Sequence, residues 1–205
     1  MLVKICGITR PEDADAAVAA GALALGFVFW PSSPRFIDPS RARDIVSTLP
    51  AFVTPVGVFV NQPLEFVADV ANLVGLGAVQ LHGDEDPAYA NRVERAVIRA
   101  VALGNGNPAS DIEVWPNRTT LLLDVHDPVH RGGTGRLVDW SAASAIARKR
   151  RTILAGGLTP ENVTQAVAQV QPFGIDVSSG VERSPGVKDH ARIAALFEAL
   201  HASRS

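Results

Sequence analysis

LVKICGIT, residues 2–9, is a short apolar run that ends in Cys6, the only cysteine of the chain, and breaks at Gly7. Successive side chains of a strand point to opposite faces, so a strand here places Lys4 and Cys6 on one face. A lysine and a thiol on the face of a buried strand need an explanation. Free cysteine is among the most buried residue types, which favours a core role for Cys6. The alternative is that the thiol belongs to a functional site.

The pattern of residues 2–9, an apolar run followed by a helix-like segment, recurs along the whole chain. We expect strands at residues 2–6, 23–30, 53–60, 78–81, 97–103, 119–125, 152–154 and 173–177. Segments with helical patterns or start signals separate them, at residues 11–20, 38–48, 63–74, 86–96, 139–148, 160–170 and 188–202. Residues 104–118 are rich in turn formers and hold at most a short helix.

Regular alternation of strands and helices predicts a parallel sheet, and continuous apolar strands are typical of a sheet that is buried on both faces. Eight such units favour a closed barrel over an open sheet. There is no linker or low-complexity tract. We therefore expect residues 1–205 to form a single (β/α)8 TIM barrel of the α/β class, with a short or degenerate helix after the fifth strand.

Composition narrows the possible functions. The 205 residues carry a net charge of −2, so there is no charge excess for nucleic acid or an anionic membrane. No apolar run approaches the roughly 18 residues of a membrane span. A single cysteine forms no internal disulfide and no cysteine-based zinc site. The expectation is a cytoplasmic protein that binds neither nucleic acid nor membrane.

Polar residues gather where the predicted strands end. In a (β/α)8 barrel the active site lies at the C-terminal ends of the strands, in the loops that follow them. The residues found there are Cys6, Ser33–Arg35, Asn61, Gln80, His82, Asp124, Gly156, Gly157, Asp176 and Ser178–Gly180. Their concentration at one rim predicts a site at that rim.

Two of these loops have the composition of a phosphate site. Gly156-Gly157 follows the seventh strand, and Ser178-Ser179-Gly180 follows the eighth. These two loops are the usual phosphate cradle of the fold, where backbone N–H groups hold the anion. Either motif alone would be an ordinary turn, but both in the expected units favour phosphate binding.

The remaining polar residues have more than one interpretation. Arg35, between Pro34 and Phe36, is either a solvated loop residue or a planar fork for a carboxylate. His82 is either a structural hydrogen-bond partner or a ligand-binding residue. His126 and His130 belong to no set of metal ligands at a recognised spacing, which disfavours a metal site.

Taken together, these motifs resemble the phosphoribosylanthranilate isomerases, (β/α)8 enzymes of tryptophan biosynthesis. The matching stretches run in order along nearly the whole chain: KICGIT (4–9), LGFVF (25–29), SPR (33–35), QLHG (80–83), LD (123–124), GGTG (132–135), LAGGL (154–158), PENV (160–163), DVSSGVE (176–182), PG (185–186) and KD (188–189). The resemblance implies an Amadori rearrangement of N-(5-phosphoribosyl)anthranilate to 1-(2-carboxyphenylamino)-1-deoxyribulose 5-phosphate. It implies no metal and no organic cofactor.

The resemblance also implies roles for individual residues. The family's general base, a cysteine that ends strand one, falls on Cys6, and its general acid, an aspartate that ends strand six, falls on Asp124. Both groups then need displaced pKa values at neutral pH. The substrate-binding residues would be Arg35 for the anthranilate carboxylate, and Gly156, Gly157, Ser178, Ser179 and Gly180 for the phosphate. Asp176 would also face the substrate, and His82 is a further substrate-binding candidate. Residues 132–135 suit a flexible lid.

Two other functions compete with this one. A related phosphosugar isomerase of histidine biosynthesis performs the same rearrangement, but that family resembles two half-barrels and uses aspartates. A catalytically silent phosphate-binding barrel is the other, and the presence of both Cys6 and Asp124 argues against it. Either a monomer or a homodimer is compatible with the barrel.

A separate hypothesis concerns Lys4, its ion-pair partner and its effect on Cys6. A lysine inside a barrel must be paired, because an unpaired buried charge is costly. Strand one closes against strand eight, so Asp176 is the nearest plausible partner. A positive Lys4 would also favour the Cys6 thiolate. The alternative is that Lys4 points to solvent at the edge of the barrel.

Overall fold

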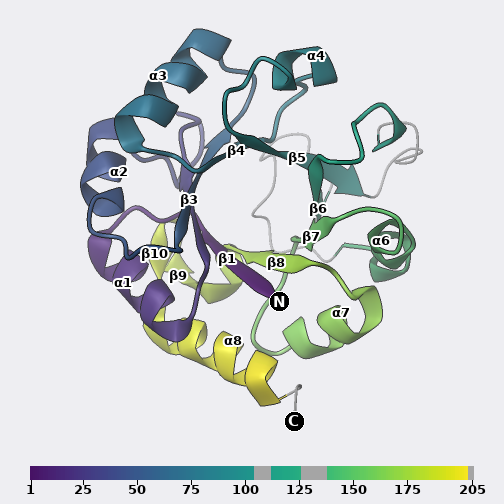
Figure 1. The fold of residues 1–205 in the computed structure, drawn as a ribbon. Helices are drawn as coiled ribbons and strands as arrows, with labels where there is room; N and C mark the ends of the chain where they lie inside the picture. The colour runs from purple at the N-terminus through teal and green to yellow at the C-terminus, as the bar shows by residue number, and fades with distance from the viewer. Residues whose placement is uncertain (104–111, 126–137, 203–205) are drawn as a thin grey trace.

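The computed structural model describes residues 1–103, 112–125 and 138–202. In this part of the chain eight parallel strands close into a barrel in the order β1 to β8, with each strand beside its neighbours in sequence (Figure 1). The strands are β1 Leu2–Cys6, β2 Ala24–Val28, β3 Thr54–Phe59, β4 Ala78–Leu81, β5 Ala96–Leu103, β6 Thr120–Val125, β7 Thr152–Leu154 and β8 Gly174–Val177. The prediction of a (β/α)8 barrel is confirmed.

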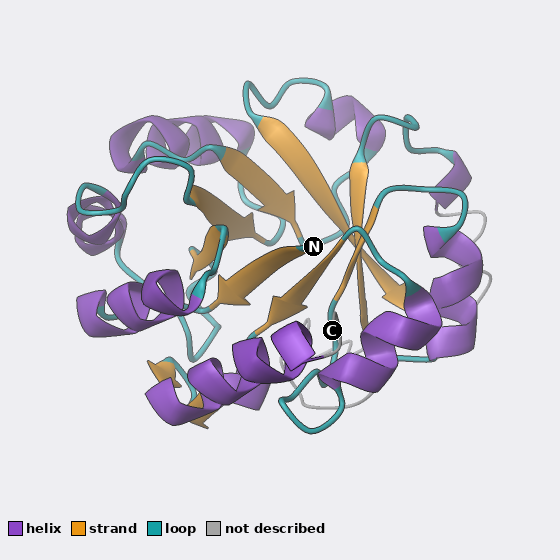
Figure 2. Ribbon diagram, turned by 60° about the horizontal axis from the view of Figure 1, so that its bottom comes forward, coloured by secondary structure: helices purple, strands orange, loops and turns teal. Residues whose placement is uncertain are grey.

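Helices surround the strands on the outside of the barrel (Figure 2). They are α1 Pro11–Ala20, α2 Pro39–Val46, α3 Leu64–Val74, α4 Pro87–Ala90, α6 Trp140–Ala147, α7 Val163–Val170 and α8 His190–Ala202. α8 closes the ring by packing between α7 and α1. Among the residues that the structure describes, no helix is long and apolar enough to cross a membrane.

Local signals in the sequence start and stop these helices. Asp38 and Asp139 precede α2 and α6, and each side chain accepts hydrogen bonds from two N–H groups of the first turn. Gly21 and Gly75 end α1 and α3 in the left-handed conformation, which glycine adopts without the strain of a side chain. These boundaries therefore follow from the residues themselves.

The apolar core lies mainly between the sheet and the helices. Ile5, Leu25, Phe27 and Leu121 are fully buried in it, and each side chain of this size contributes roughly 1.5–3 kcal/mol when it leaves water. Inside the barrel the apolar clusters are small, such as that of Ala24, Val56 and Ala78. The interior therefore has space for polar side chains near the strand ends.

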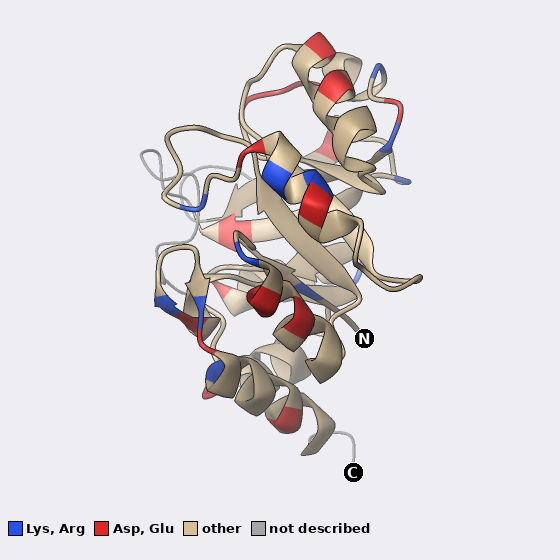
Figure 3. Ribbon diagram, turned by 90° about the vertical axis from the view of Figure 1, so that its left-hand side faces the viewer, with Lys and Arg blue, Asp and Glu red and all other residues tan. Residues whose placement is uncertain are grey.

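Most charged residues belong to the outer helices and to loops (Figure 3). A few are instead buried, and apart from Asp13 and Glu85 they are close to the strand ends predicted to form the site. Those few are Lys4, Asp13, Glu85, Asp124, Asp176 and Lys188. Burial of charge is costly without a partner, so each position requires a specific contact.

Some predicted helix boundaries are wrong. The helix expected over residues 86–96 is only Pro87–Ala90, because Arg95 donates to the Leu76 carbonyl at 3.0 Å and holds the following segment against the end of α3. The helix expected from Pro160 begins at Val163, because Asn162 Oδ1 accepts from the N–H of Thr159 and forms a turn there. The segment after strand five lies largely outside the described residues.

The end of the chain differs most from expectation. Between β8 and α8 the structure has a 3-10 turn, Ser179–Val181, and an antiparallel pair of short strands, β9 Glu182–Ser184 and β10 Val187–Lys188. α8 starts after this hairpin, because Asp189 Oδ1 accepts from the N–H groups of Ala191 and Arg192 and so caps the helix. The hairpin lies beside α1 and α8 (Figure 1).

Candidate active site

Lys4, Cys6 and Asp176 share one inner face of the barrel. Lys4 lies directly opposite Asp176 in the β1–β8 register, and its Nζ donates to Asp176 Oδ1 at 2.9 Å. A Cβ on Gly26 would lie 2.6 Å from Cys6 Sγ and 2.9 Å from Lys4 Nζ, so both side chains converge over this glycine. Lys4 is fully buried. The predicted Lys4–Asp176 pair is confirmed.

The surroundings of Cys6 set the charge state of the thiol. Burial raises the pKa of Cys6, and the positive charge of Lys4 opposes this effect without cancelling it. Burial alone would lower the pKa of Lys4, yet the carboxylate of Asp176 holds it above its ordinary value. The free protein therefore holds an ammonium–carboxylate pair beside a neutral thiol. This raised pKa is the opposite of the lowered pKa that Cys6 would need to be a thiolate in the free protein.

A second polar group lies across the barrel from Cys6. It consists of Gln80, His82 and Asp124, and Asp124 is the last residue but one of β6. Gln80 Nε2 lies 2.9 Å from His82 Nδ1, which confirms that these two residues share a face. His82 Nε2 lies 3.6 Å from Asp124 Oδ2, and Asp124 Oδ1 accepts from the N–H of Val125 at 2.7 Å. Asp124 and Gln80 are buried. The structure thus places a carboxyl group beside a histidine at the same rim as Cys6.

The loops after β7 and β8 are packed against each other. Gly156 and Gly157 both have positive φ angles, 78° and 65°. A Cβ on Gly180 would lie 1.9 Å from the carbonyl oxygen of Leu158, so only glycine fits at this contact. Asn162 Nδ2 donates to the Gly157 carbonyl at 2.9 Å and stabilises the first loop. The two predicted phosphate loops form one continuous surface.

Backbone donors on this surface are available to an anion. Within the described ranges, the N–H groups of Gly157, Ser179 and Gly180 make no hydrogen bond to the protein. Partly buried N–H groups without partners at such loops suit an anion. The Ser178 hydroxyl differs from expectation, because it donates to the Cys6 carbonyl at 3.1 Å. Arg192 supports the loop from behind by donating to the Gly180 carbonyl at 2.8 Å.

Gly180→Ala tests this surface. The added methyl group overlaps the Leu158 carbonyl and must push the two loops apart, at a cost of about 1–3 kcal/mol in folding free energy. We expect KM for a phosphorylated substrate to rise at least about tenfold, as when a contact worth about 1.4 kcal/mol is lost. Steady-state kinetics and thermal unfolding measure both effects.

Gly75→Ala is the matched control, since Gly75 also has a positive φ but a Cβ there meets open space. It should lower stability without changing KM. An unchanged KM in Gly180→Ala would remove the phosphate role of the loops.

Arg35 lies at the rim, with its guanidinium bound to Glu182. Arg35 Nε donates to Glu182 Oε1 at 2.9 Å, and Nη2 donates to Oε2 at 2.7 Å. The Arg35 side chain crosses over Gly7, where a Cβ would meet Arg35 Cδ at 2.6 Å. A guanidinium has five N–H donors, so three remain for another acceptor. Arg35 is therefore fixed by the protein and still able to bind a carboxylate.

Glu182 and Lys188 were not predicted as site residues. Glu182 also accepts from Lys188 Nζ at 2.7 Å, and both side chains are almost completely buried. Burial would raise the pKa of Glu182, but the hydrogen bond from Arg35 and the charge of Lys188 hold it below its ordinary value. Both residues stand in matching family stretches, yet only the folded hairpin shows that they meet Arg35.

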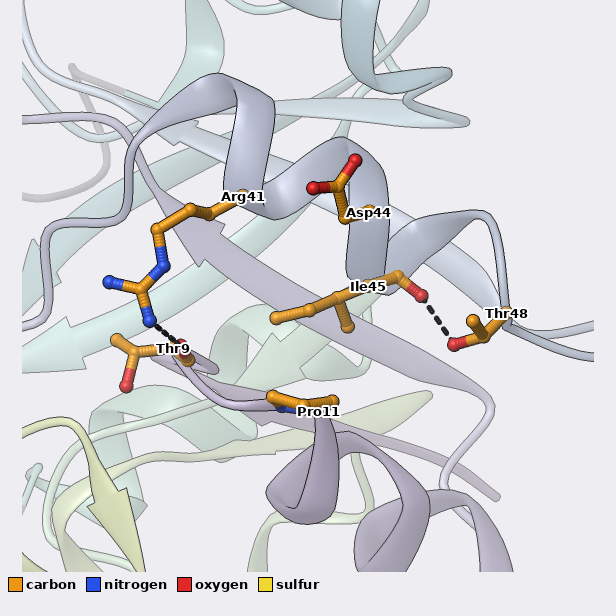
Figure 4. A pocket seen from close by; sticks show the side chains of 6 residues that line it. All are labelled: Thr9, Pro11, Arg41, Asp44, Ile45 and Thr48. Carbon is orange, nitrogen blue, oxygen red and sulfur yellow. Dashed lines mark hydrogen bonds between the residues drawn. The ribbon is translucent and has the colours of Figure 1, made fainter.

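A pocket of about 330 Å³ lies outside the barrel, between α2 and the segment that leads into α1 (Figure 4). Arg41 reaches across it and donates to the Thr9 carbonyl at 3.4 Å. None of the predicted site residues lines this pocket. The proposed lid, residues 132–135, lies outside the described residues, as do His126 and His130. Among the described residues, no group of three or more His, Cys, Asp or Glu side chains is arranged to hold a metal ion.

Fold and site together define a class of protein: a (β/α)8 barrel whose strand ends carry a thiol, a carboxyl group and an anion-binding pair of loops. Comparison with known proteins specifies it further. A family model described as N-(5'-phosphoribosyl)anthranilate (PRA) isomerase matches residues 3–199. The chain belongs to this family.

Individual relatives and solved structures agree with this family membership. The chain is 50% identical over 195 residues to the N-(5'-phosphoribosyl)anthranilate isomerase of Citrifermentans bemidjiense, covering 95% of this chain and 94% of the relative. It matches the phosphoribosyl anthranilate isomerase of Thermotoga maritima with a TM-score of 0.92 and 43% identity, over 98% of this chain and 99% of that one. A further solved isomerase, with a TM-score of 0.88, 42% identity and coverage of 98% and 100%, is in complex with reduced 1-(o-carboxyphenylamino)-1-deoxyribulose 5-phosphate.

Proposed function

We propose that this chain is a phosphoribosylanthranilate isomerase, which converts N-(5-phosphoribosyl)anthranilate to 1-(2-carboxyphenylamino)-1-deoxyribulose 5-phosphate in tryptophan biosynthesis. The observation that carries the proposal is the placement of the Cys6 thiol, the Asp124 carboxyl group and the unpartnered N–H groups of residues 157, 179 and 180 at one rim. Family membership supplies the substrate.

The reaction needs one acid and one base. Asp124 in its protonated form gives its proton to the ring oxygen of the ribose, the bond from C1′ to that oxygen breaks, and a cationic Schiff base forms. The Cys6 thiolate then removes the proton from C2′, and the electron pair of that bond neutralises the iminium nitrogen. The resulting enol tautomerises to the ketose. Acid–base groups in such positions typically contribute 10²–10⁴-fold each.

The raised pKa of Cys6 in the free protein fits this sequence of steps. Burial disfavours the thiolate as long as no further positive charge is near. Ring opening creates a cation on the substrate beside the thiol, and an opposite charge favours the ionised form. The thiol then releases its proton to solvent, and the resulting thiolate takes the proton from C2′. Deprotonation of C2′ is thereby linked to ring opening, and the thiol stays neutral in the empty site.

The other residues bind and orient the substrate. Arg35 holds the anthranilate carboxylate with the N–H groups that Glu182 does not use. The loops of Gly156, Gly157, Ser178, Ser179 and Gly180 hold the phosphate. Asp176, whose Oδ1 is bound to Lys4, faces the sugar with its other oxygen, and His82 contacts the substrate beside Asp124. No cofactor enters these steps.

The domain organisation, the cellular location and the oligomeric state stay predictions. We propose that residues 1–205 act as one catalytic domain in the cytoplasm, without a nucleic-acid or membrane partner. The oligomeric state is a monomer or a homodimer; one relative from Thermotoga maritima is described as dimeric. Sedimentation velocity on the purified protein measures it.

Loss of substrate fluorescence tests the proposed function. The purified chain should consume fluorescent phosphoribosylanthranilate, and Asp124→Asn should stop the reaction. The imidazole-ribonucleotide substrate of histidine biosynthesis, which carries an aminoaldose of the same kind, serves as the comparison and should not be converted. Binding of phosphoribosylanthranilate without turnover would favour a silent phosphate-binding barrel instead.

A further inference from the structure

Lys188 is a buried cation that the reaction steps above do not use. Its Nζ donates to the carbonyl oxygen of Cys6, although the two residues are 182 positions apart in the chain. The same carbonyl accepts from the Ser178 hydroxyl. Lys188 is 1% exposed, so its charge must be balanced by groups of the protein. The contact joins the β9–β10 hairpin to the end of the strand that carries the thiol.

Glu182 holds Lys188 in this place. Its carboxylate accepts from Lys188 Nζ at 2.7 Å and from two nitrogens of Arg35. Burial lowers the pKa of Lys188, and the charge of Glu182 and its hydrogen bond oppose this effect. With Lys188 protonated, two cations share one carboxylate, which leaves a positive charge without a counterpart in a buried group. Lys4 and Asp176 form a separate pair whose charges cancel. The buried environment of Cys6 thus has a surplus of one positive charge while the thiol is neutral.

The ionisable groups that face Cys6 and Lys188 come from several elements around them. They are Lys4 on β1, Asp13 on α1, Arg35 in the loop after β2, Asp176 on β8 and Glu182 on β9. Asp13 contacts the backbone N–H of Lys188, and its carboxylate is also bound by Arg10 and His190. Its charge is therefore compensated within its own group. The surplus positive charge is therefore shared by Lys188 and Arg35 around Glu182, and Lys188 is the one of the two that acts directly on Cys6.

We infer that Lys188, held by Glu182, is a positioning residue of the active site, which fixes the main chain at Cys6 and supplies the buried positive charge that balances the Cys6 thiolate. This inference rests on the proposed role of Cys6 as the base. Removal of a proton from the thiol turns the surplus of one positive charge into neutrality. In agreement with this role, the charge of Lys188 opposes the effect of burial on the pKa of Cys6.

A purely structural clamp is the competing explanation. Lys188 would then hold the hairpin against β1 without any effect on the thiol. The two explanations differ in how the titration of Cys6 responds to charge. Because Cys6 is the only cysteine, the rate of alkylation by iodoacetamide as a function of pH reports this one thiol without substrate.

Lys188→Met is the first variant. It removes the charge and the bond to the Cys6 carbonyl, while Arg35 remains as a counter-ion for Glu182. We expect the pKa of Cys6 to rise by about one unit, as for loss of a nearby opposite charge. We also expect kcat to fall about tenfold or more at neutral pH, since a unit of pKa changes the thiolate fraction tenfold.

The double variant, Lys188→Met with Glu182→Gln, separates the effect of the charge near Cys6 from the effect of fixing the Cys6 main chain. The double variant restores the surplus positive charge through Arg35, but the bond to the Cys6 carbonyl stays absent. The pKa of Cys6 should return most of the way to that of the wild type, while kcat stays lowered. Arg183→Met, an exposed change on the same hairpin, is the control and should leave the titration unchanged.

The outcomes decide between the explanations. A higher thiol pKa in the single variant and its return in the double variant support the inference. An identical thiol titration in wild type and both variants overturns it, even where activity falls. Should the single variant fail to fold, an unshifted pKa in the double variant together with wild-type kcat also overturns it. A wild-type protein that does not convert phosphoribosylanthranilate refutes the proposed function instead, and the titration remains interpretable.

Discussion

Cys6→Ser lowers kcat about 10²–10⁴-fold in our account, because a hydroxyl of ordinary pKa does not supply the base that removes the C2′ proton. The thiol is not replaced by a near neighbour of similar chemistry, since Cys6 is the only cysteine. KM changes little, because the carboxylate and phosphate contacts are made by other residues. Steady-state loss of substrate fluorescence measures both constants.

Stability provides the control for Cys6→Ser. The sulfur packs with Val28 and Val58, so the smaller, more polar oxygen costs folding free energy as well. Circular dichroism and thermal unfolding show whether the variant is folded at the assay temperature. A folded Cys6→Ser protein with wild-type kcat would contradict the assignment of the base.

Lys4→Met has the second large expected effect, on stability. The change leaves the Asp176 carboxylate buried without its partner, and loss of one member of a buried ion pair typically costs about 3–5 kcal/mol. The pKa of the Cys6 thiol should also rise, because the positive charge that opposes burial is removed. Denaturant unfolding and thiol alkylation measure the two effects separately.

Lys4→Met with Asp176→Asn is the matched comparison. Removing both charges relieves the unpaired carboxylate, so the double variant should be more stable than Lys4→Met alone, as a double-mutant cycle would show. Equal stability of wild type and Lys4→Met would contradict the ion pair. An unchanged thiol pKa in Lys4→Met would leave the pair as a purely structural contact.

The barrel itself could be predicted because its signals are local. Each strand is an apolar run, and most ends were predicted to within about two residues, as for β4 at Ala78–Leu81. The pairing of Lys4 with Asp176 followed from the rule that strand one closes against strand eight. The common face of Gln80 and His82 followed from strand alternation.

The features missed by sequence analysis depend on contacts between distant residues. The β9–β10 hairpin is held by Glu182 and Lys188, whose partners Arg35 and Cys6 lie far away in the chain. Nothing in a periodic pattern signals such a contact. The early end of α4 similarly depends on Arg95 reaching back to α3.

The charge state of Cys6 was not predictable either. Residue types suggested a thiolate beside a lysine, but the balance depends on how deeply the sulfur is buried and on which carboxylate the lysine already serves. Both quantities depend on how the folded chain packs around the sulfur. The same is true of Arg35, whose binding to Glu182 determines which of its N–H groups remain available.

The most direct test of the account is the reaction of phosphoribosylanthranilate labelled with deuterium at C2′, followed in a single turnover with wild type and Cys6→Ser. The account predicts that wild-type enzyme converts the labelled substrate several-fold more slowly than the unlabelled one, because the C2′ bond breaks in the step that Cys6 carries out. It also predicts that folded Cys6→Ser converts neither at an appreciable rate. Conversion by Cys6→Ser at the wild-type rate would show that another group removes this proton.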